Sequence, residues 1–215
     1  MHERGMQGQP LQLEEGWLCL DFANTVSWHA SARPQEKLNT YADLVAWARS
    51  VRLVEDKAAD RLLTEAAQRP EEAQAALHAA RALREAIYRV FAAVAAGADP
   101  APADLDTVNE ALARGMVYLR VARAGDEFRW WWDVPRGSLT GMLWPVARSA
   151  AELLTSDDLS RVGQCADEDG CGWLFFDVSK NHSRRWCGPG CANRAKARRF
   201  YARIKQAGED QWGRV

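Results

Sequence analysis

Residues 165–191 read CADEDGCGWLFFDVSKNHSRRWCGPGC and hold four of the five cysteines of this 215-residue chain. The spacing is Cys165-x5-Cys171-x15-Cys187-x3-Cys191, two close pairs separated by an insert of hairpin length. A structural Zn²⁺ ion takes four ligands at the corners of a tetrahedron, and each close pair supplies two thiolates from one turn. We therefore expect one structural Zn²⁺ ion per chain, held by these four cysteines.

Two disulfides are the alternative use of the same cysteines. The first ten residues contain no apolar stretch of the kind that precedes a secretory cleavage site, so we expect a cytoplasmic protein with reduced thiols. His182 and the acidic residues 167–169 are other potential ligands, but four thiolates already close the site and leave no position for a catalytic water. The fifth cysteine, Cys19, lies in an apolar segment and is expected to be a buried thiol.

The residues around the cysteines predict a small treble-clef-like unit. We expect a strand over residues 173–178, a turn at residues 181–183 that returns the chain to Cys187, and a helix over about residues 192–205. A unit of this size has little apolar core, so bound metal supplies much of its folding free energy. We expect this core to be separate from the core of the preceding residues.

The charge is unevenly distributed along the chain. Twenty-eight Lys and Arg residues against 29 Asp and Glu residues give a net charge of -1, yet residues 160–215 hold eleven basic and six acidic side chains. Nine cations and no acid lie between Val178 and Gly208. An acidic body with a basic tail indicates a module that faces nucleic acid, and we expect DNA as the partner. The candidate contacts are Lys180, Arg184, Arg185, Arg194, Lys196, Arg198, Arg199 and Arg203.

The C-terminal helix also has an apolar stripe. Ala197, Phe200, Tyr201 and Ile204 recur at helical spacing, and we expect them to pack on the zinc hairpin with the cations on either side. Arg194, three residues after the last cysteine, is expected to support the metal site or to contact DNA. The alternatives are a solvated basic helix, or a basic surface for RNA or for a protein partner.

Residues 1–157 predict a mainly helical domain. Helices are expected over residues 41–51, 55–68, 70–97, 104–114 and 137–154 from their apolar periodicity, whereas the apolar segment 15–25 fits a buried strand or the start of a helix. Two β-rich runs near residues 116–133 flank Gly125-Asp126 and predict a hairpin, in which the three tryptophans 130–132 serve in packing. No apolar run approaches the ~20 residues that span a membrane. The fold class is therefore α+β and mainly helical: residues 1–157, a finger over residues 158–206, and a tail over 207–215.

Two stretches resemble known families. Residues 186–199, WCGPGCANRAKARR, resemble the CGNR zinc finger, with Cys191-Ala192-Asn193-Arg194 in place of its Cys-Gly-Asn-Arg, and Cys165 with residues 171–175 resemble its first half. Ala192 departs from the motif and implies a helical position there. Residues 18–25, LCLDFANT, with Leu44 and Trp47, resemble the ABATE domain that commonly precedes this finger. The resemblance implies a family proposed to be stress-induced bacterial transcription regulators.

The functional prediction is a DNA-binding transcription regulator and not an enzyme. Its N-terminal domain is expected to sense a small-molecule effector, bind a partner or form a homodimer. The candidate ligand pocket consists of Asp21, Asn24, Trp28, His29 and Arg33. The alternative is an enzyme or ligand-binding protein that uses Asp21, Asn24, His29 and Arg33, with the finger as a structural staple. Asp21 and Asn24 are equally explained as hydrogen-bonding residues in a buried turn.

Overall fold

The computed structural model describes residues 5–6 and 9–212. The helices in chain order are α1 (Leu18–Ala23), α2 (Tyr41–Ser50), α3 (Asp56–Gln68), α4 (Pro70–Ala95), α5 (Pro102–Met116), α6 (Leu143–Leu154), the short 3-10 helix η1 (Leu159–Arg161) and α7 (Pro189–Trp212). The strands are β1 (Val26–Ser27), β2 (Gln35–Glu36), β3 (Leu119–Ala124), β4 (Glu127–Trp132), β5 (Val162–Gln164) and β6 (Leu174–Phe176). They form three antiparallel pairs, β1 with β2, β3 with β4 and β5 with β6.

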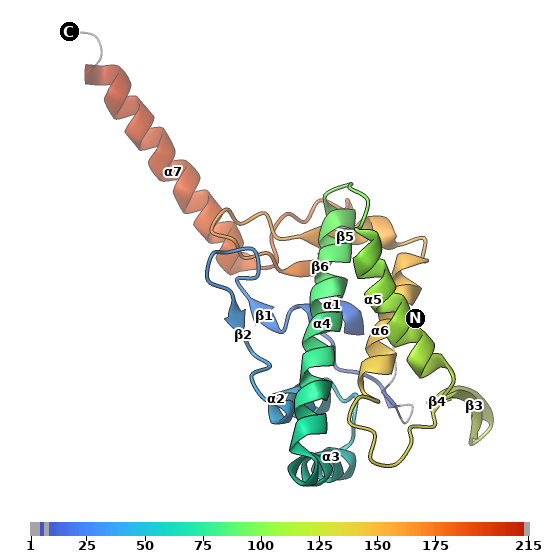
Figure 1. Cartoon of the computed structure of the whole chain (residues 1–215). Coiled ribbons are helices and arrows are strands. Elements are labelled where there is room, and N and C mark those ends of the chain that lie inside the picture. Colours follow the sequence, from blue (N-terminus) through green and yellow to red (C-terminus); the bar gives the residue numbers. More distant parts are fainter. Residues whose placement is uncertain (1–4, 7–8, 213–215) are drawn as a thin grey trace.

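The helical body is built around α4. Pro70 occupies its first turn, where a missing N–H costs nothing, and Glu71 and Glu72 lie at its positive end. Helix α5 packs along α4, and α6 packs along α5 (Figure 1). Helix α2 begins with a capping box in which Thr40 and Asp43 bind each other's backbone N–H groups. These local signals are readable in the sequence, and the mainly helical fold class is confirmed.

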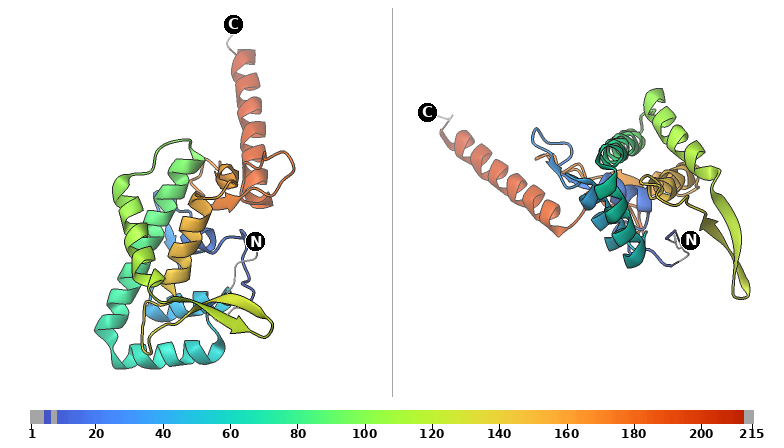
Figure 2. Two further views of the ribbon diagram at one scale, coloured as in Figure 1. Left: turned by 90° about the vertical axis from the view of Figure 1, so that its right-hand side faces the viewer. Right: turned by 60° about the horizontal axis from the view of Figure 1, so that its bottom comes forward.

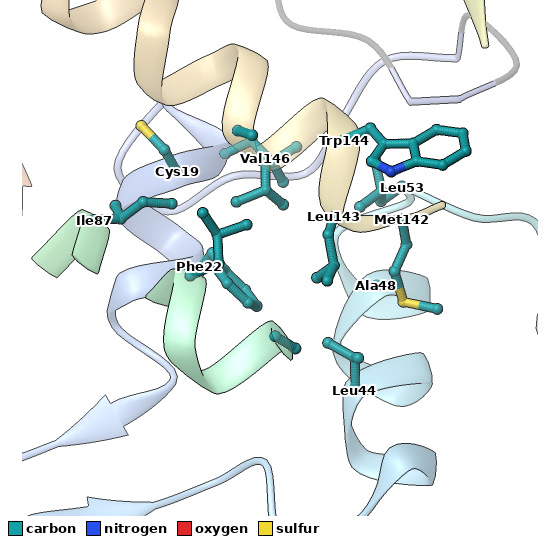
Figure 3. Close-up of a cluster of buried hydrophobic side chains, with 14 of the residues drawn as sticks. Cys19, Phe22, Leu44, Ala48, Leu53, Ile87, Met142, Leu143, Trp144 and Val146 are labelled. Carbon is teal, nitrogen blue, oxygen red and sulfur yellow. The ribbon is translucent and has the colours of Figure 1, made fainter. Parts of the chain in front are cut away.

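Helix α1 is the centre of the hydrophobic core. All six of its residues are buried, and it packs against α4, α6 and β6. Figure 3 shows Phe22 of α1 among Leu44 of α2, Ile87 of α4 and Val146 of α6. A fully buried side chain of this size stabilises the fold by about 1.5–3 kcal/mol. The segment that fitted either a strand or a helix is therefore a buried helix, and Cys19 lies within it, fully buried.

The β3–β4 hairpin has the predicted turn at residues 125–126, with Gly125 at φ 65°. Its tryptophans are only partly used in packing. Trp132 is buried, whereas Trp130 is 55% and Trp131 40% exposed. The packing expected for all three is wrong because the hairpin extends away from the helical body (Figure 2), and Trp130 contacts the guanidinium of Arg148 in α6, which lies 5.0 Å from its ring centroid.

Helix α6 is shorter than predicted. It begins at Leu143, not near Gly137, because Gly137 has φ 75° and residues 133–142 form turns. Arg69 Nη2 donates to the carbonyl oxygen of Gly137 at 2.6 Å. Tyr41 Oη donates to that of Leu139 at 2.8 Å. The loop is thus held by two side chains from distant parts of the chain, Tyr41 of α2 and Arg69 between α3 and α4.

The zinc-finger hairpin pairs differently from the prediction. Strand β6 pairs with β5, which precedes Cys165, so the first cysteine pair lies in the connection between the two strands. Val162 of β5 and Leu174 of β6 are buried in the same cluster as α1, α4 and α6. The expectation of two separate cores is therefore wrong: the finger and the helical body share one through this hairpin.

Helix α7 leaves the body as a long projecting rod (Figure 1). Its apolar stripe does not pack on the hairpin as predicted, since Phe200 is 56%, Tyr201 69% and Ile204 54% exposed. The cause is the direction of the helix, which its first turns set at the cysteine cluster. Among the described residues, no helix is both long and apolar enough to cross a membrane.

Candidate metal centre and basic helix

The four cysteines of the C-terminal part converge on one point. Their sulfur atoms all lie within 4.8 Å of one another, and all four are free thiols. The Sγ atoms of Cys171 and Cys187 are 3.7 Å apart, and those of Cys187 and Cys191 are 3.4 Å apart. A tetrahedron with metal–sulfur distances of ~2.3 Å has edges of ~3.8 Å. The donor set therefore fits one four-coordinate Zn²⁺ ion.

Without a cation, two of these four thiols resist ionisation. Burial is the main cause that raises the pKa of Cys187 to about 12, and burial also raises the pKa of Cys191. Burial acts in the same direction at Cys165, but backbone hydrogen bonds from Cys187 and Asp167 leave its pKa lowered. A bound divalent cation removes the obstacle because it favours all four thiolates at once.

Two glycines bring the first cysteine pair against the helical body. Gly170 and Gly172 have φ values of 86° and 65°. A Cβ atom on Gly172 would lie 2.7 Å from the backbone nitrogen of Ala30. The backbone N–H of His29 donates to the carbonyl oxygen of Cys171 at 3.1 Å. The metal loop is thus seated on the turn that follows β1.

Arg194 links the cysteine cluster to the body. Its Nη2 donates to Cys191 Sγ at 2.9 Å, and its Nε donates to Asp167 Oδ2 at 2.9 Å. The guanidinium also lies over the ring of Trp28, 4.8 Å from its centroid. Burial alone would raise the pKa of Asp167, but the hydrogen bonds from Arg194 and the Asp169 N–H lower it. Arg194 thus lies within hydrogen-bond distance of the Cys191 sulfur, the position that the sequence predicts for a residue that supports a metal site.

A second bridge involves Arg184. Its guanidinium forms an ion pair with Glu15 at 3.1 Å, and Glu15 also accepts from Trp173 Nε1 at 3.0 Å. The Glu15 side chain is only 7% exposed. Sequence reasoning missed Glu15, because a contact across 169 residues leaves no local pattern.

The eight candidate DNA contacts fall into two groups. Arg184, Arg194 and Arg198 are half-buried and make ion pairs within the chain, Arg198 with Asp167, Glu168 and Asp169. The other five are exposed and, in the part of the chain that the structure describes, make no ion pair; they are Lys180, Arg185, Lys196, Arg199 and Arg203. Arg185 and Arg199 lie over the ring of Trp186, at 5.2 and 5.7 Å from its centroid.

Two of the candidate pocket residues form internal hydrogen bonds. The Asp21 carboxylate accepts from the backbone N–H groups of Glu14 and Glu15 at 2.8 and 3.0 Å. Burial raises the pKa of Asp21 to about 7. The Asn24 side chain pairs with the backbone of Leu174, with Nδ2 donating to its oxygen at 2.8 Å and Oδ1 accepting from its N–H at 3.0 Å. Asn24 thereby joins the end of α1 to a strand of the finger.

The other three pocket candidates have separate partners. Trp28 lies below Arg194, and the His29 ring stacks on Tyr88 with 3.5 Å between centroids. His29 Nε2 also lies 2.9 Å from Glu85 Oε2. Arg33 is exposed in the loop between β1 and β2. The structure therefore does not gather the five residues into one pocket: Asp21, Asn24 and His29 direct their polar atoms at different neighbours, and Arg33 lies in solvent.

Two cavities lie elsewhere, on α2 and α3. One, of about 460 Å³, is lined by Val45, Arg49 and Asp56 among others. The other, of about 670 Å³, lies between α3, the base of the β3–β4 hairpin and the loop 133–142. Figure 1 shows α3 at the end of the molecule opposite α7. Both cavities are thus remote from the cysteine cluster.

Comparison with known proteins identifies both parts of the chain. The ABATE family model matches residues 16–157, and the CGNR zinc finger model matches residues 161–204. No curated protein is similar enough to match. The first match spans well over half of the chain and includes α1 through α6, while the second includes all four clustered cysteines. The chain therefore belongs to the family described as putative stress-induced transcription regulators, and its C-terminal part is a CGNR zinc finger.

Proposed function

We propose that this protein regulates transcription by binding duplex DNA through α7 and the loop before it. Cys165, Cys171, Cys187 and Cys191 hold one structural Zn²⁺ ion, which fixes the first turn of α7. The ion supplies folding free energy and takes no part in a reaction, because the four thiolates complete its coordination. The helix then projects from the body with Lys196, Arg199 and Arg203 in solvent.

One observation carries this proposal: the eight candidate basic residues divide into three that are ion-paired within the chain and five that are exposed. Three arginines are consumed by internal ion pairs, while five exposed cations have none among the described residues. Phosphate contacts require exposed, unpaired cations on a surface that fits a groove, and an isolated helix presents them on more than one side. We assign the five exposed cations to phosphate contacts and the three paired arginines to holding the basic surface in place.

The exposed aromatic residues of α7 favour nucleic acid over simple solubility. Exposed Phe200 and Tyr201 do not contribute to the solubility of a solvated helix, whereas aromatic rings beside arginines can make apolar contacts in a DNA groove, such as with thymine methyl groups. Asp21, Asn24, Trp28 and His29 are proposed to hold the finger on the body, so no catalytic role is assigned to them. Homodimerisation stays a prediction, to be measured by sedimentation.

The experiment is a binding titration of the full, zinc-loaded chain against a duplex selected from random oligonucleotides. Five phosphate contacts predict a slope of about -4.5 for log affinity against log salt. Lys196→Gln, Arg199→Gln and Arg203→Gln should each flatten the slope by about 0.9.

Lys57→Gln is the matched control. Lys57 is an exposed helical lysine on α3 with no ion pair among the described residues, so its loss should leave the slope unchanged. Binding that does not depend on salt, or equal effects of Lys57→Gln and Lys196→Gln, would refute the proposal. Tighter binding to a single-stranded RNA of the same length would assign the surface to RNA.

A further inference from the structure

We propose that the 670 Å³ cavity between α3 and the loop 133–142 binds a small amphipathic anion, an aromatic or aliphatic carboxylate. The cavity lies at the far end of the body from α7 and contains none of the pocket residues expected from the sequence. Its volume falls within the range of about 300–1,000 Å³ typical of small-molecule sites. The inference goes beyond the DNA contact proposed above and does not depend on it.

The walls of the cavity are apolar. Met6, Val54, Leu62, Trp132 and Met142 line it, and all but the half-buried Leu62 are buried. Trp131, 40% exposed, adds an indole ring at its edge. Such a lining favours a flat or flexible hydrocarbon body, because burying it removes apolar surface from water.

The rim of the cavity carries two arginines that are unpaired among the described residues. Arg61 of α3 and Arg136 of the loop line it, and within the described part of the chain neither makes an ion pair or hydrogen bond through its side chain. Two carboxylates also lie on the rim. Glu65 is bound by Arg69 at 2.9 Å, so it does not compete for these arginines, whereas Asp133 is exposed. The two unpaired guanidiniums therefore favour a ligand carboxylate, which accepts two parallel hydrogen bonds from one arginine.

The rim is preformed. The bonds from Arg69 to Gly137 and from Tyr41 to Leu139 fix the loop that carries Arg136. A Cβ atom on Gly141 would lie 2.5 Å from Val134 Cγ1, so the loop packs closely on itself. A fixed rim binds a ligand without the entropic cost of ordering a loop.

The test uses three probes of one shape: biphenyl-4-carboxylate, its neutral carboxamide, and the cationic biphenyl-4-ylmethylammonium. Isothermal titration calorimetry on the full, zinc-loaded chain should give saturable 1:1 binding of the carboxylate, with Kd between about 10 µM and 1 mM. The carboxamide and the ammonium probe should bind at least about fivefold more weakly, since they lose the charge-assisted hydrogen bonds.

Variants locate the site. Arg61→Gln and Arg136→Gln should each raise Kd for the carboxylate about three- to tenfold, and both residues are exposed, so neither change threatens the fold. Arg33→Gln is the matched control, because Arg33 is also exposed without an ion pair among the described residues and belongs to the other candidate pocket.

Four results would overturn the inference. The carboxylate could show no saturable binding up to about 2 mM, or it could bind with the same affinity as the carboxamide. The ammonium probe could bind more tightly than the carboxylate, or Arg33→Gln could raise Kd as much as Arg61→Gln and Arg136→Gln do. DNA affinity measured on the same variants at fixed salt tests the DNA proposal separately, because Arg61 and Arg136 are not among the proposed phosphate contacts.

Discussion

Asn24→Ala tests the joint between the helical body and the finger. Asn24 is 4% exposed and Leu174 is fully buried, so water does not replace the two hydrogen bonds between them. Truncation leaves the N–H and the carbonyl of Leu174 without partners inside the core. Each unsatisfied buried backbone group costs about 1–3 kcal/mol, so the variant should lose about 4 kcal/mol of unfolding free energy. Few natural domains have more than about 15 kcal/mol in total.

The assay is urea unfolding of the zinc-saturated, reduced protein followed by far-UV circular dichroism. Asn39→Ala is the control. Asn39 Nδ2 also donates to a backbone oxygen, that of Glu36 at 3.3 Å, but at an exposed site, so its loss should cost less than about 0.5 kcal/mol. A loss below about 1 kcal/mol for Asn24→Ala, or equal losses for the two variants, would refute the reasoning.

Three further predictions concern the same contact region. Burial raises the pKa of Asp21 from 3.8 to about 7, so the folded state binds the carboxyl proton more tightly than the unfolded state does. The free energy of unfolding should therefore fall as pH rises from about 4 to 7. Asp21→Asn should flatten this pH dependence. Cys187→Ser should reduce bound zinc below half an equivalent. Hydrogen exchange should then show protection lost over residues 179–205 but kept in β5 and β6, because these strands lie in the shared core. Loss of protection in β5 and β6 as well would contradict this prediction. Arg194→Lys removes the paired hydrogen bonds to Asp167 and the stacking on Trp28. It should therefore lower the free energy of unfolding by about 1–3 kcal/mol and speed the loss of zinc to a chelator. The control variant Arg199→Lys should change neither the unfolding free energy nor the rate of zinc loss.

The elements set by local signals were predictable from the sequence. Helix α4 has its proline, its acidic first turn and its apolar periodicity within one segment, and the cysteine cluster has a spacing that geometry restricts. The strand pairing of the finger was not predictable in this way, because Val162 and Phe176 are brought opposite each other by packing on α1 and α4. Periodicity also cannot show what an apolar face meets. Phe200 and Ile204 have the spacing of packed residues, yet the direction of α7 leaves them in solvent.

In the candidate site, too, the local features were predictable from the sequence and the long-range contacts were not. The four cysteines are near in sequence, and a short motif fixes them. The partners that give the basic residues their separate roles are distant: Glu15 for Arg184, and Trp28 for Arg194. A count of charges therefore treats alike eight residues that the fold separates into three bound and five exposed.

The projection of α7 has a mechanical consequence. A helix rises about 1.5 Å per residue, so the part beyond Arg198 is a lever roughly 20 Å long whose fulcrum is the cluster of Asp167, Arg194 and Trp28. A tilt of about 10° at that fulcrum swings the tip by roughly 3–4 Å, about equal to the axial rise of ~3.4 Å between successive phosphates on one DNA strand. Displacements of a few tenths of an ångström at the contact of Asp167, Arg194 and Trp28 are thereby magnified at the C-terminal end of α7.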